Sequence, residues 1–264
     1  MKLGFGLYAH QLTIDNYRFA RQAGATHVVA HLTDYFRQNV KNSRGDQPTG
    51  GSSGWGRAGN AEEGVWSIER LNSLKQDMAT EGLVLHALEN LDPAVWHDIL
   101  LDGPKRSEQI SRVKTILRNM GAAGIPILGI YFSLAGVAGR TRGRFARGSA
   151  ESVGMEGHIP DEPIPHGMVW NMVYDEQAEP GFLPHLTHEE LWARRRSFLE
   201  DVLPTAQEAG VIIASHPDDP PLPIIRQTPR LTHSESSFDK LIAEPNHPHN
   251  KLEFCCGTLA EMEG

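Results

Sequence analysis

Short runs of Val, Ile and Leu alternate along the chain with longer segments in which apolar residues recur at helical spacing. This alternation is typical of repeated βα units, in which a buried strand is followed by an amphipathic helix. The apolar runs predict six strands, at residues 3–9, 27–31, 83–89, 127–132, 211–216 and 251–255. The segments between them predict helices at residues 14–23, 67–81, 105–120, 188–209 and 236–243. We therefore expect an α/β protein with a parallel sheet.

Three of the predicted helices run into a glycine, namely Gly24, Gly121 and Gly210. Because glycine tolerates the positive φ that stops a helix, these positions predict helix ends. A predicted strand follows each of them within a few residues, which supports the parallel arrangement.

Polar side chains recur where the predicted strands end, at His10, His31, Glu89, His216 and Cys255. No glycine-rich phosphate loop follows the first strand, which disfavours a doubly wound sheet. In a parallel (β/α)8 TIM-type barrel, the carboxyl ends of the strands meet at one mouth, where active sites lie. We therefore expect such a barrel. Because it needs eight strands and six are predicted, we expect it to be truncated after the sixth strand or completed by another chain.

Two long inserts interrupt the repeat, at about residues 34–63 and 135–184. Each follows the end of a predicted strand, and loops of this length are usually lids, binding loops or disordered segments. The second insert contains an arginine cluster, formed by Arg140, Arg142, Arg144 and Arg147. Arginine can hold a carboxylate with two parallel hydrogen bonds, so the cluster is either a clamp for an acidic substrate or a solvated loop.

Composition narrows the class of protein. The 264 residues, 39% of them apolar, are expected to form a single domain over residues 1–264. A formal charge of −8 without a basic block argues against nucleic acid or an anionic membrane as partner. No run of about 18 apolar residues, as a membrane-spanning helix needs, occurs in the sequence. We therefore expect a cytoplasmic enzyme.

The candidate chemistry lies at the ends of the last two predicted strands. His216 follows a buried strand and precedes a segment stiffened by prolines, which suits the rigid presentation of a metal ligand. Cys255 repeats this arrangement at the end of the next strand, and its neighbour Cys256 is too close in sequence to bridge it easily. An imidazole beside a thiolate favours Zn, Fe or Mn ions over Ca or Mg.

These stretches resemble the signature of the D-mannonate dehydratase family. The resemblance rests on the run His-Pro-Asp-Asp-Pro-Pro at residues 216–221, on Pro229-Arg230, and on Phe-Cys-Cys-Gly-Thr-Leu at residues 254–259. Further likeness occurs at residues 21–26, 64–67, 98–99, 103–104 and 118–126, at Glu89 and at Tyr131. The matches are collinear along nearly the whole chain.

The resemblance implies a barrel of the xylose isomerase-like group that converts D-mannonate to 2-keto-3-deoxy-D-gluconate and water in hexuronate breakdown. It implies a divalent metal, which we expect to be Mn2+ or Fe2+, a sugar acid substrate and a homo-oligomer. The site residues it implies are the metal ligands His216 and Cys255, the catalytic residues Arg140 and Tyr131, and the substrate contacts His31, Glu89, Trp66 and Asp218. Two of these contacts have other readings: Trp66 can pack a helix start, and Glu89 can form a salt bridge.

The chain also departs from the family pattern. Residues 132–134 are Phe-Ser-Leu where the family has Asn-Phe-Met, and no Trp precedes Arg140 closely. A further His and Asp ligand, and a catalytic Tyr and His, have no counterpart. We therefore expect weak metal binding, with activity in doubt. The alternatives are a sugar isomerase or epimerase of the same barrel group and an inactive remnant.

Overall fold

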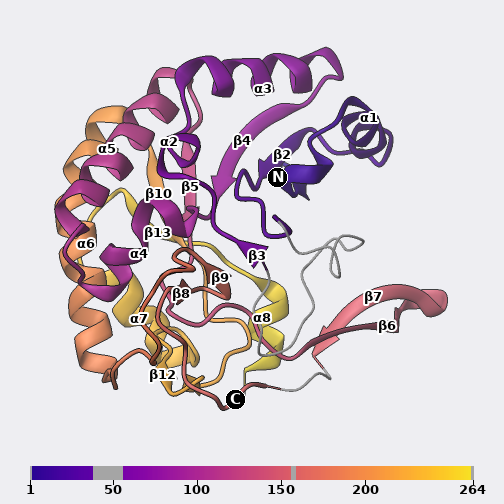
Figure 1. Cartoon of the computed structure of the whole chain (residues 1–264). Helices are drawn as coiled ribbons and strands as arrows, with labels where there is room; N and C mark the ends of the chain where they lie inside the picture. Colours follow the sequence, from indigo (N-terminus) through magenta and orange to yellow (C-terminus); the bar gives the residue numbers. More distant parts are fainter. Residues whose placement is uncertain (1, 38–55, 156–158, 263–264) are drawn as a thin grey trace.

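The centre of the molecule is a parallel sheet of six strands in the order β1-β2-β4-β5-β10-β13 (Figure 1). The computed structural model describes residues 2–37, 56–155 and 159–262. The strands are β1 Gly4–Leu7, β2 His27–Ala30, β4 Val84–Glu89, β5 Ile127–Ile130, β10 Ile212–Ser215 and β13 Asn250–Leu252. All six lie where the apolar runs predict them. Because all the neighbouring strands of this sheet pair in parallel, the carboxyl ends of all six lie at the same end of the sheet.

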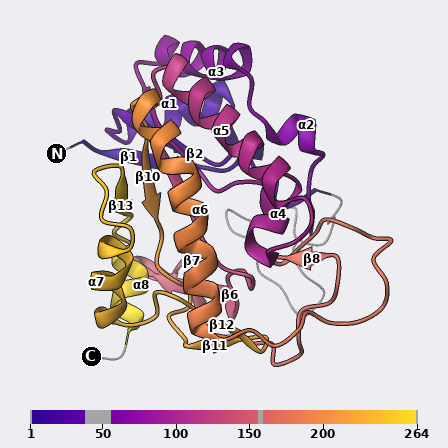
Figure 2. The same cartoon turned by 90° about the vertical axis from the view of Figure 1, so that its left-hand side faces the viewer.

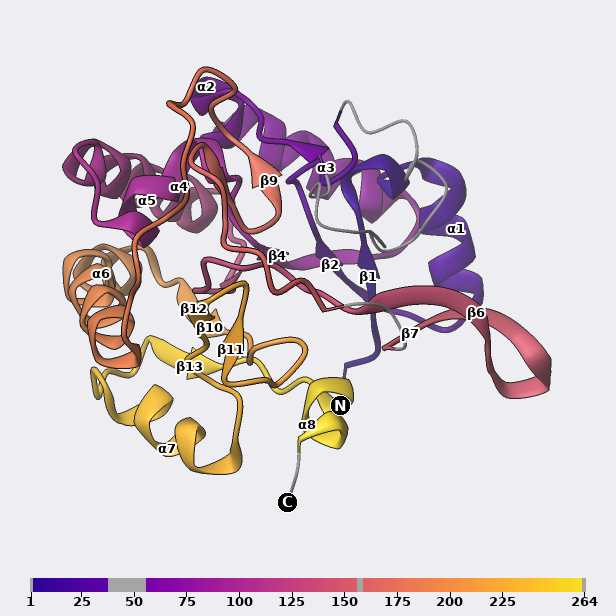
Figure 3. The same ribbon diagram turned by 60° about the horizontal axis from the view of Figure 1, so that its bottom comes forward.

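Helices surround the sheet on its outer side, as the arc around the strands in Figure 3 shows. Helices α4, α5 and α6 lie in front of the sheet in Figure 2. The main helices are α1 Ile14–Gln22, α3 Ile68–Thr80, α4 Pro93–Leu101, α5 Arg106–Ala122, α6 His188–Ala209 and α7 Glu235–Ala243. Strand residues such as Val28 and Leu128 and helix residues such as Leu71, Val113 and Phe198 are fully buried in one core. Each such side chain contributes about 1.5–3 kcal/mol through burial.

Local sequence signals set the ends of α6. At its start, the Thr187 hydroxyl accepts the Glu190 N–H at 3.2 Å, and the Glu190 carboxylate accepts the Thr187 N–H at 2.8 Å. This reciprocal capping satisfies two backbone donors that would otherwise lack partners. At its end, Gly210 adopts a φ of 68°, as predicted. The helix therefore begins and ends at positions that the sequence marks.

One expectation about a helix end is wrong, and one helix was not predicted. Gly121 does not end a helix, because α5 continues to Ala122 and Gly124 takes the positive φ instead. A Cβ on Gly121 would lie 2.4 Å from the carbonyl oxygen of Ala209, so this glycine allows α5 and α6 to approach closely. Helix α4 was not predicted because it is buried on nearly all sides and lacks the polar face that reveals a helix.

The strands do not close into a barrel within the described residues. There, β1 pairs with β2 alone and β13 with β10 alone, so the parallel sheet has two edges. The strands and their outer helices form an arc like part of a barrel wall (Figure 3). The parallel βα architecture is therefore confirmed, whereas closure is not.

The two inserts contain secondary structure and meet each other. Residues 38–55 of the first lie outside the described residues, and its remainder forms β3 Gly56–Arg57 and α2 Ala61–Gly64. The second forms the antiparallel pair β6 Arg140–Ala146 and β7 Ala150–Met155, followed by β8 Met168–Val169 and β9 Met172–Val173. Strand β3 pairs with β9, which joins the two inserts in one small sheet.

The remaining elements are short. They are the 3-10 turns η1 Ala9–Gln11 and η3 Arg147–Ser149, the pair β11 Ile224–Ile225 and β12 Thr228–Pro229, and helix α8 Cys256–Glu261. Across residues 2–37, 56–155 and 159–262, no helix has the length and apolar character needed to cross a membrane.

Candidate active site

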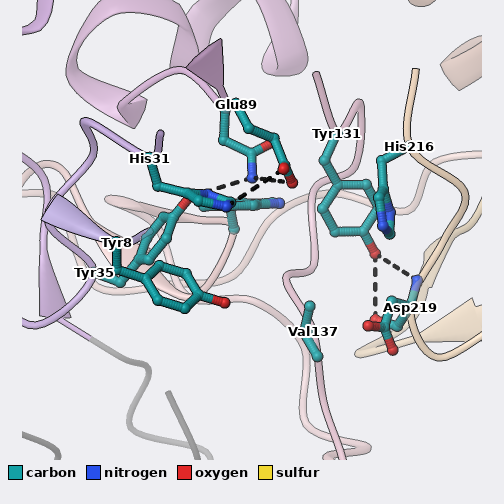
Figure 4. A pocket seen from close by; sticks show the side chains of 10 residues that line it. Tyr8, His31, Tyr35, Glu89, Tyr131, Val137, His216 and Asp219 are labelled. Carbon is teal, nitrogen blue, oxygen red and sulfur yellow. Dashed lines mark hydrogen bonds and ion pairs between the residues drawn. The ribbon is translucent and has the colours of Figure 1, made fainter. Parts of the chain in front are cut away.

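A small cavity of about 80 Å3 opens at the carboxyl ends of the central strands (Figure 4). Five of its wall residues come from five neighbouring strands. Tyr8 follows β1, His31 follows β2, Glu89 ends β4, Tyr131 follows β5 and His216 follows β10. The predicted convergence of polar strand ends is therefore confirmed for His31, Glu89 and His216.

The inserts supply the other side of this cavity. Tyr35 comes from the first insert, and Val137 and Trp170 come from the second. Asn90 and Asp219 complete the wall. Because β3 and β9 tie the two inserts together, both of them cover the mouth formed by the strand ends.

His31 is held as a neutral imidazole. Its Nε2 lies 3.4 Å from Glu89 Oε2, and its Nδ1 lies 3.1 Å from the Tyr35 hydroxyl, which in turn accepts a hydrogen bond from the Asn90 amide at 3.2 Å. These contacts fit the tautomer in which Nε2–H donates to Glu89 and Nδ1 accepts from Tyr35. Burial, aided by the charge of His216, lowers the pKa of His31 to about 4. His31 therefore stays uncharged at neutral pH.

Glu89 forms a carboxyl pair with Glu253, which follows β13 directly. Burial raises the pKa of both groups, and the mutual repulsion of the two carboxylates helps to raise that of Glu253 to about 7. Gly129 in β5 leaves room for the pair, since a Cβ there would lie 2.9 Å from Glu253 Oε2 and from Glu89 Cγ. The pair therefore holds a proton near neutral pH. Sequence reasoning missed Glu253 because the residue fell inside a predicted strand.

His216 and Cys255 contact each other through a hydrogen bond between their side chains. Burial alone would lower the pKa of His216, but Cys255, Glu253 and Glu89 outweigh it and raise the pKa to about 9. The hydrogen bond from His216 lowers the pKa of the Cys255 thiol to about 7, against the opposing effect of burial. The other imidazole nitrogen, Nδ1, donates to the Pro217 carbonyl at 2.6 Å. At neutral pH, His216 is therefore an imidazolium beside a thiol that is about half ionised.

Tyr131 is fixed in the wall by a buried arginine, Arg230. The Tyr131 hydroxyl accepts hydrogen bonds from the Arg230 guanidinium and from the Asp219 N–H, the latter at 3.1 Å. Arg230 Nε also donates to Asp218 Oδ1 at 2.7 Å. Burial raises the pKa of Tyr131 far above its ordinary value, so the phenol keeps its proton.

The predicted substrate contact Asp218 does not line the cavity. Its carboxylate is occupied by Arg230 and by the Thr232 N–H, which lies 2.6 Å from Oδ2. The neighbouring Asp219 lines the cavity instead.

Three other predicted residues lie outside the cavity wall. Cys255 contacts His216, which lines the cavity, but does not line it itself. Arg140 forms ion pairs with Asp219 and with Glu261 Oε1, the latter at 3.0 Å. Arg140 therefore contacts a residue of the cavity wall without lining the cavity itself. Trp66 is 2% exposed in the core, where its carbonyl accepts the Asn119 amide at 2.8 Å. The position of Trp66 therefore agrees with the alternative that it packs in the core at a helix start.

The whole constellation can be compared with known proteins. The family model described as D-mannonate dehydratase (UxuA) matches residues 1–151 and 165–263, which is most of the chain. The chain belongs to the D-mannonate dehydratase family. The resemblance seen in the sequence is thus confirmed.

Individual mannonate dehydratases are also similar to this chain in sequence. The mannonate dehydratase of Streptococcus pneumoniae (strain 70585) is 29% identical over 211 residues, which cover 74% of this chain and 56% of that protein. Mannonate dehydratase 2 of Halalkalibacterium halodurans is 27% identical over 211 residues, covering 76% and 60%. The chain therefore spans little more than half the length of these curated relatives.

Solved structures show the same fold. The crystal structure of mannonate dehydratase from Streptococcus suis serotype 2 superposes with a TM-score of 0.67 and 25% identity, covering 98% of this chain and 64% of that one. A D-psicose 3-epimerase superposes with a TM-score of 0.52 at 8% identity, covering 94% and 61%, which shows a shared fold alone.

Membership of the D-mannonate dehydratase family implies a divalent metal, and the donor chemistry of His216 and Cys255 fits one. Because His216 Nδ1 donates to the Pro217 carbonyl, Nε2 is left as the ligand atom, an orientation that metal-binding histidines commonly have. The thiol of Cys255 already ionises near neutral pH. Within the described part of the chain, no group of three or more His, Cys, Asp or Glu side chains is arranged to hold a metal. The structure thus brings together two suitable donors.

Proposed function

We propose that this chain carries the substrate-binding and metal-binding strand ends of a D-mannonate dehydratase, acting in hexuronate breakdown in the cytoplasm. The reaction removes water from D-mannonate and gives 2-keto-3-deoxy-D-gluconate. The observation that carries the proposal is the meeting of the His216–Cys255 pair with Glu89, His31 and Tyr131 at one mouth, in a chain of this family.

Tyr131, His31 and Glu89 are proposed to bind and orient the sugar acid. The Tyr131 hydroxyl oxygen accepts hydrogen bonds from two N–H groups. The hydroxyl proton is donated to the Asp219 carbonyl over a long distance of 3.4 Å, so the proton can instead be donated to a carboxylate oxygen of the substrate. The neutral His31 side chain and the Glu89 side chain line the same cavity, where they can form hydrogen bonds with the hydroxyl groups of a sugar. Arg140 acts through Asp219, whose place in the wall it fixes.

Proton transfer is the main task of the remaining groups. In the reaction, the C2–H bond breaks and its proton passes to a base, while the C3–O bond breaks and the hydroxyl leaves as water after receiving a proton. The resulting enol becomes the 2-keto product. The Glu89–Glu253 pair retains a proton near neutral pH. Because Glu89 lines the cavity, we assign to Glu89 the step in which this proton is donated to the departing hydroxyl.

His216 Nε2 and Cys255 Sγ are the proposed ligands of Mn2+ or Fe2+, both of which suit imidazole and thiolate donors. Such an ion supplies Lewis-acid stabilisation of the negative charge that develops when a proton is removed beside a carboxylate.

The proposal is tested by incubating the protein with D-mannonate and Mn2+ or Fe2+ and measuring 2-keto-3-deoxy-D-gluconate. We expect product with the wild type and with the Cys256→Ser control, because the Cys256 side chain is exposed and has no proposed role. We expect no product with His216→Gln or with Cys255→Ser. A parallel assay of D-psicose and D-fructose interconversion detects an epimerase. Epimerisation without dehydration, or equal turnover by all variants, would overturn the assignment.

A further inference from the structure

The turn between β8 and β9 holds a tryptophan in an unusual backbone conformation. Trp170 and Asn171 connect these two antiparallel strands. Both residues have a positive φ, which is 55° for Trp170 and 59° for Asn171. A two-residue hairpin turn of this kind is normally formed by Asn-Gly, because a bulky side chain is disfavoured at positive φ. Trp170 therefore occupies a conformation that costs free energy.

The hairpin is fixed on the segment that follows β5. The Trp170 N–H donates to the Leu134 carbonyl at 2.6 Å, and the Asn171 side-chain amide donates to the Val137 carbonyl at 2.7 Å. Gly136 allows this approach, since a Cβ there would lie 2.6 Å from Asn171 Nδ2. Strained residues of this kind concentrate at functional sites, where the surroundings hold them in place. Here the strain holds the Trp170 side chain in the wall of the active-site cavity.

The indole of Trp170 extends from one side of the cavity to the other. In Figure 4, Tyr35 lies beside His31 on one side, and Tyr131 lies on the opposite side. The ring centroid of Trp170 is 5.2 Å from that of Tyr35 and 5.9 Å from that of Tyr131. The indole therefore lies between the group proposed to bind the carboxylate of the sugar acid and a group proposed to bind its hydroxyls.

The two walls of the cavity differ in chemistry. The strand ends supply mostly titratable side chains, whereas the inserts supply Tyr35, Val137 and Trp170, which consist largely of carbon. An open-chain sugar acid carries C–H groups between its hydroxyls, and an aromatic ring offers these C–H groups a large apolar surface. The polar wall and the aromatic wall therefore suit the two kinds of group along such a chain.

The size of the cavity favours a slim ligand. Its volume is about 80 Å3, well below the roughly 300–1,000 Å3 of pockets that take larger ligands. Tryptophan is the largest side chain in the wall, so Trp170 is the residue whose truncation would widen the cavity most. An extended carbon chain needs less width than a sugar ring.

We propose that Trp170 determines specificity, because its indole makes the cavity a slot for an open-chain sugar acid and excludes a ring. The indole packs along the carbon chain and occupies the space that a pyranose ring would need. Rejection of one ligand by a clash is a common source of specificity. The inference rests on the proposed function, since it concerns the ligand of the same cavity.

Calorimetry in a buffer with Mn2+ tests the slot, with D-mannonate and with methyl α-D-glucopyranosiduronate, a sugar acid locked as a ring. We expect the wild type to bind D-mannonate about tenfold or more tightly than the ring. Trp170→Asn removes the indole, and asparagine suits the positive φ of the turn. In this variant the ratio of the two Kd values should fall about tenfold, toward equal binding. Trp170→Phe keeps an aromatic face in the wall and should keep most of the preference.

Phe182→Ala is the matched control. Phe182 is an aromatic residue of the same insert, but it is 57% exposed and lies outside the cavity wall, so its removal should leave the ratio unchanged. Circular dichroism checks that each variant is folded, and Trp170→Leu takes the place of Trp170→Asn if that variant is not.

The slot is overturned by a wild type that binds the ring as tightly as D-mannonate, or that binds neither. An unchanged ratio in Trp170→Asn overturns it too, as does an equal change in Phe182→Ala. Failure of the dehydratase assignment looks different. Selective binding of D-mannonate without formation of 2-keto-3-deoxy-D-gluconate refutes the reaction and supports the slot, whereas product formation with an unchanged ratio in Trp170→Asn refutes the slot alone.

Discussion

The hydrogen bond between His216 and Cys255 should control the reactivity of the thiol. It is the largest cause of the lowered pKa of Cys255, which is about 7 instead of the ordinary 9.0. Burial acts in the opposite direction, and Thr258 gives a smaller lowering. Replacing His216 by Gln removes the imidazolium, so we expect the midpoint of thiol alkylation against pH to move from about 7 toward 9 or above.

The size of the effect at pH 7 follows from these two pKa values. With a pKa of about 7 half of the thiol is ionised, whereas with a pKa of about 9 the ionised fraction is roughly 1%, which is about fifty times less. A thiolate of higher pKa is also the better nucleophile, by about eightfold for two pKa units. The alkylation rate at pH 7 should therefore fall about sixfold, while the rate at high pH should rise.

The assay is iodoacetamide labelling followed by mass spectrometry, in EDTA so that metal does not protect the thiol. Both proteins carry Cys256→Ser, which leaves Cys255 as the only thiol of the chain. His249→Gln is the matched control, since the His249 ring contacts the Val211 carbonyl at 2.8 Å and not the thiol. An unchanged midpoint in the His216→Gln protein would refute the reasoning, as would an equal shift in the His249→Gln protein.

Three further predictions concern packing and binding. Arg230→Met should lower the free energy of unfolding in urea by about 3–5 kcal/mol, because it leaves the buried Asp218 carboxylate without its cation; adding Asp218→Asn should recover part of the loss, and no recovery would count against the ion pair. Gly121→Ala should lower the thermal midpoint despite the better helix propensity of alanine, since crowding against Ala209 costs about 1–3 kcal/mol; a raised midpoint would contradict this. Tyr131→Phe should weaken D-mannonate binding about three- to tenfold in calorimetry, through the loss of one hydrogen bond; unchanged affinity would exclude the hydroxyl as a ligand contact.

Features encoded in short stretches of sequence were predicted correctly. The central strands β5 and β10 were found because continuous apolar runs mark strands that are buried on both faces. The meeting of His31, Glu89 and His216 followed from the rule that parallel strands share one carboxyl end. Cys255 was placed beside His216 because β10 and β13 are neighbours.

Features that depend on distant contacts were missed. Glu253 gains its chemistry from Glu89, on a strand far away in sequence, and from the space that Gly129 leaves. Asp218 and Asp219 are equivalent in sequence, and only the position of Arg230 decides which of them faces the cavity. Strands β6 and β7 were expected to be an irregular loop, since glycines and arginines conceal their alternation and no core contact reveals them.

The central claim is that His216 and Cys255 hold a divalent metal at the mouth where D-mannonate binds. A crystal structure of the protein with Mn2+ and D-mannonate tests it most directly, through the anomalous difference density of manganese. The account predicts a peak within bonding distance of His216 Nε2 and Cys255 Sγ, with the sugar acid beside it against Tyr131. Manganese bound elsewhere, or a sugar acid bound away from this cavity, would contradict it.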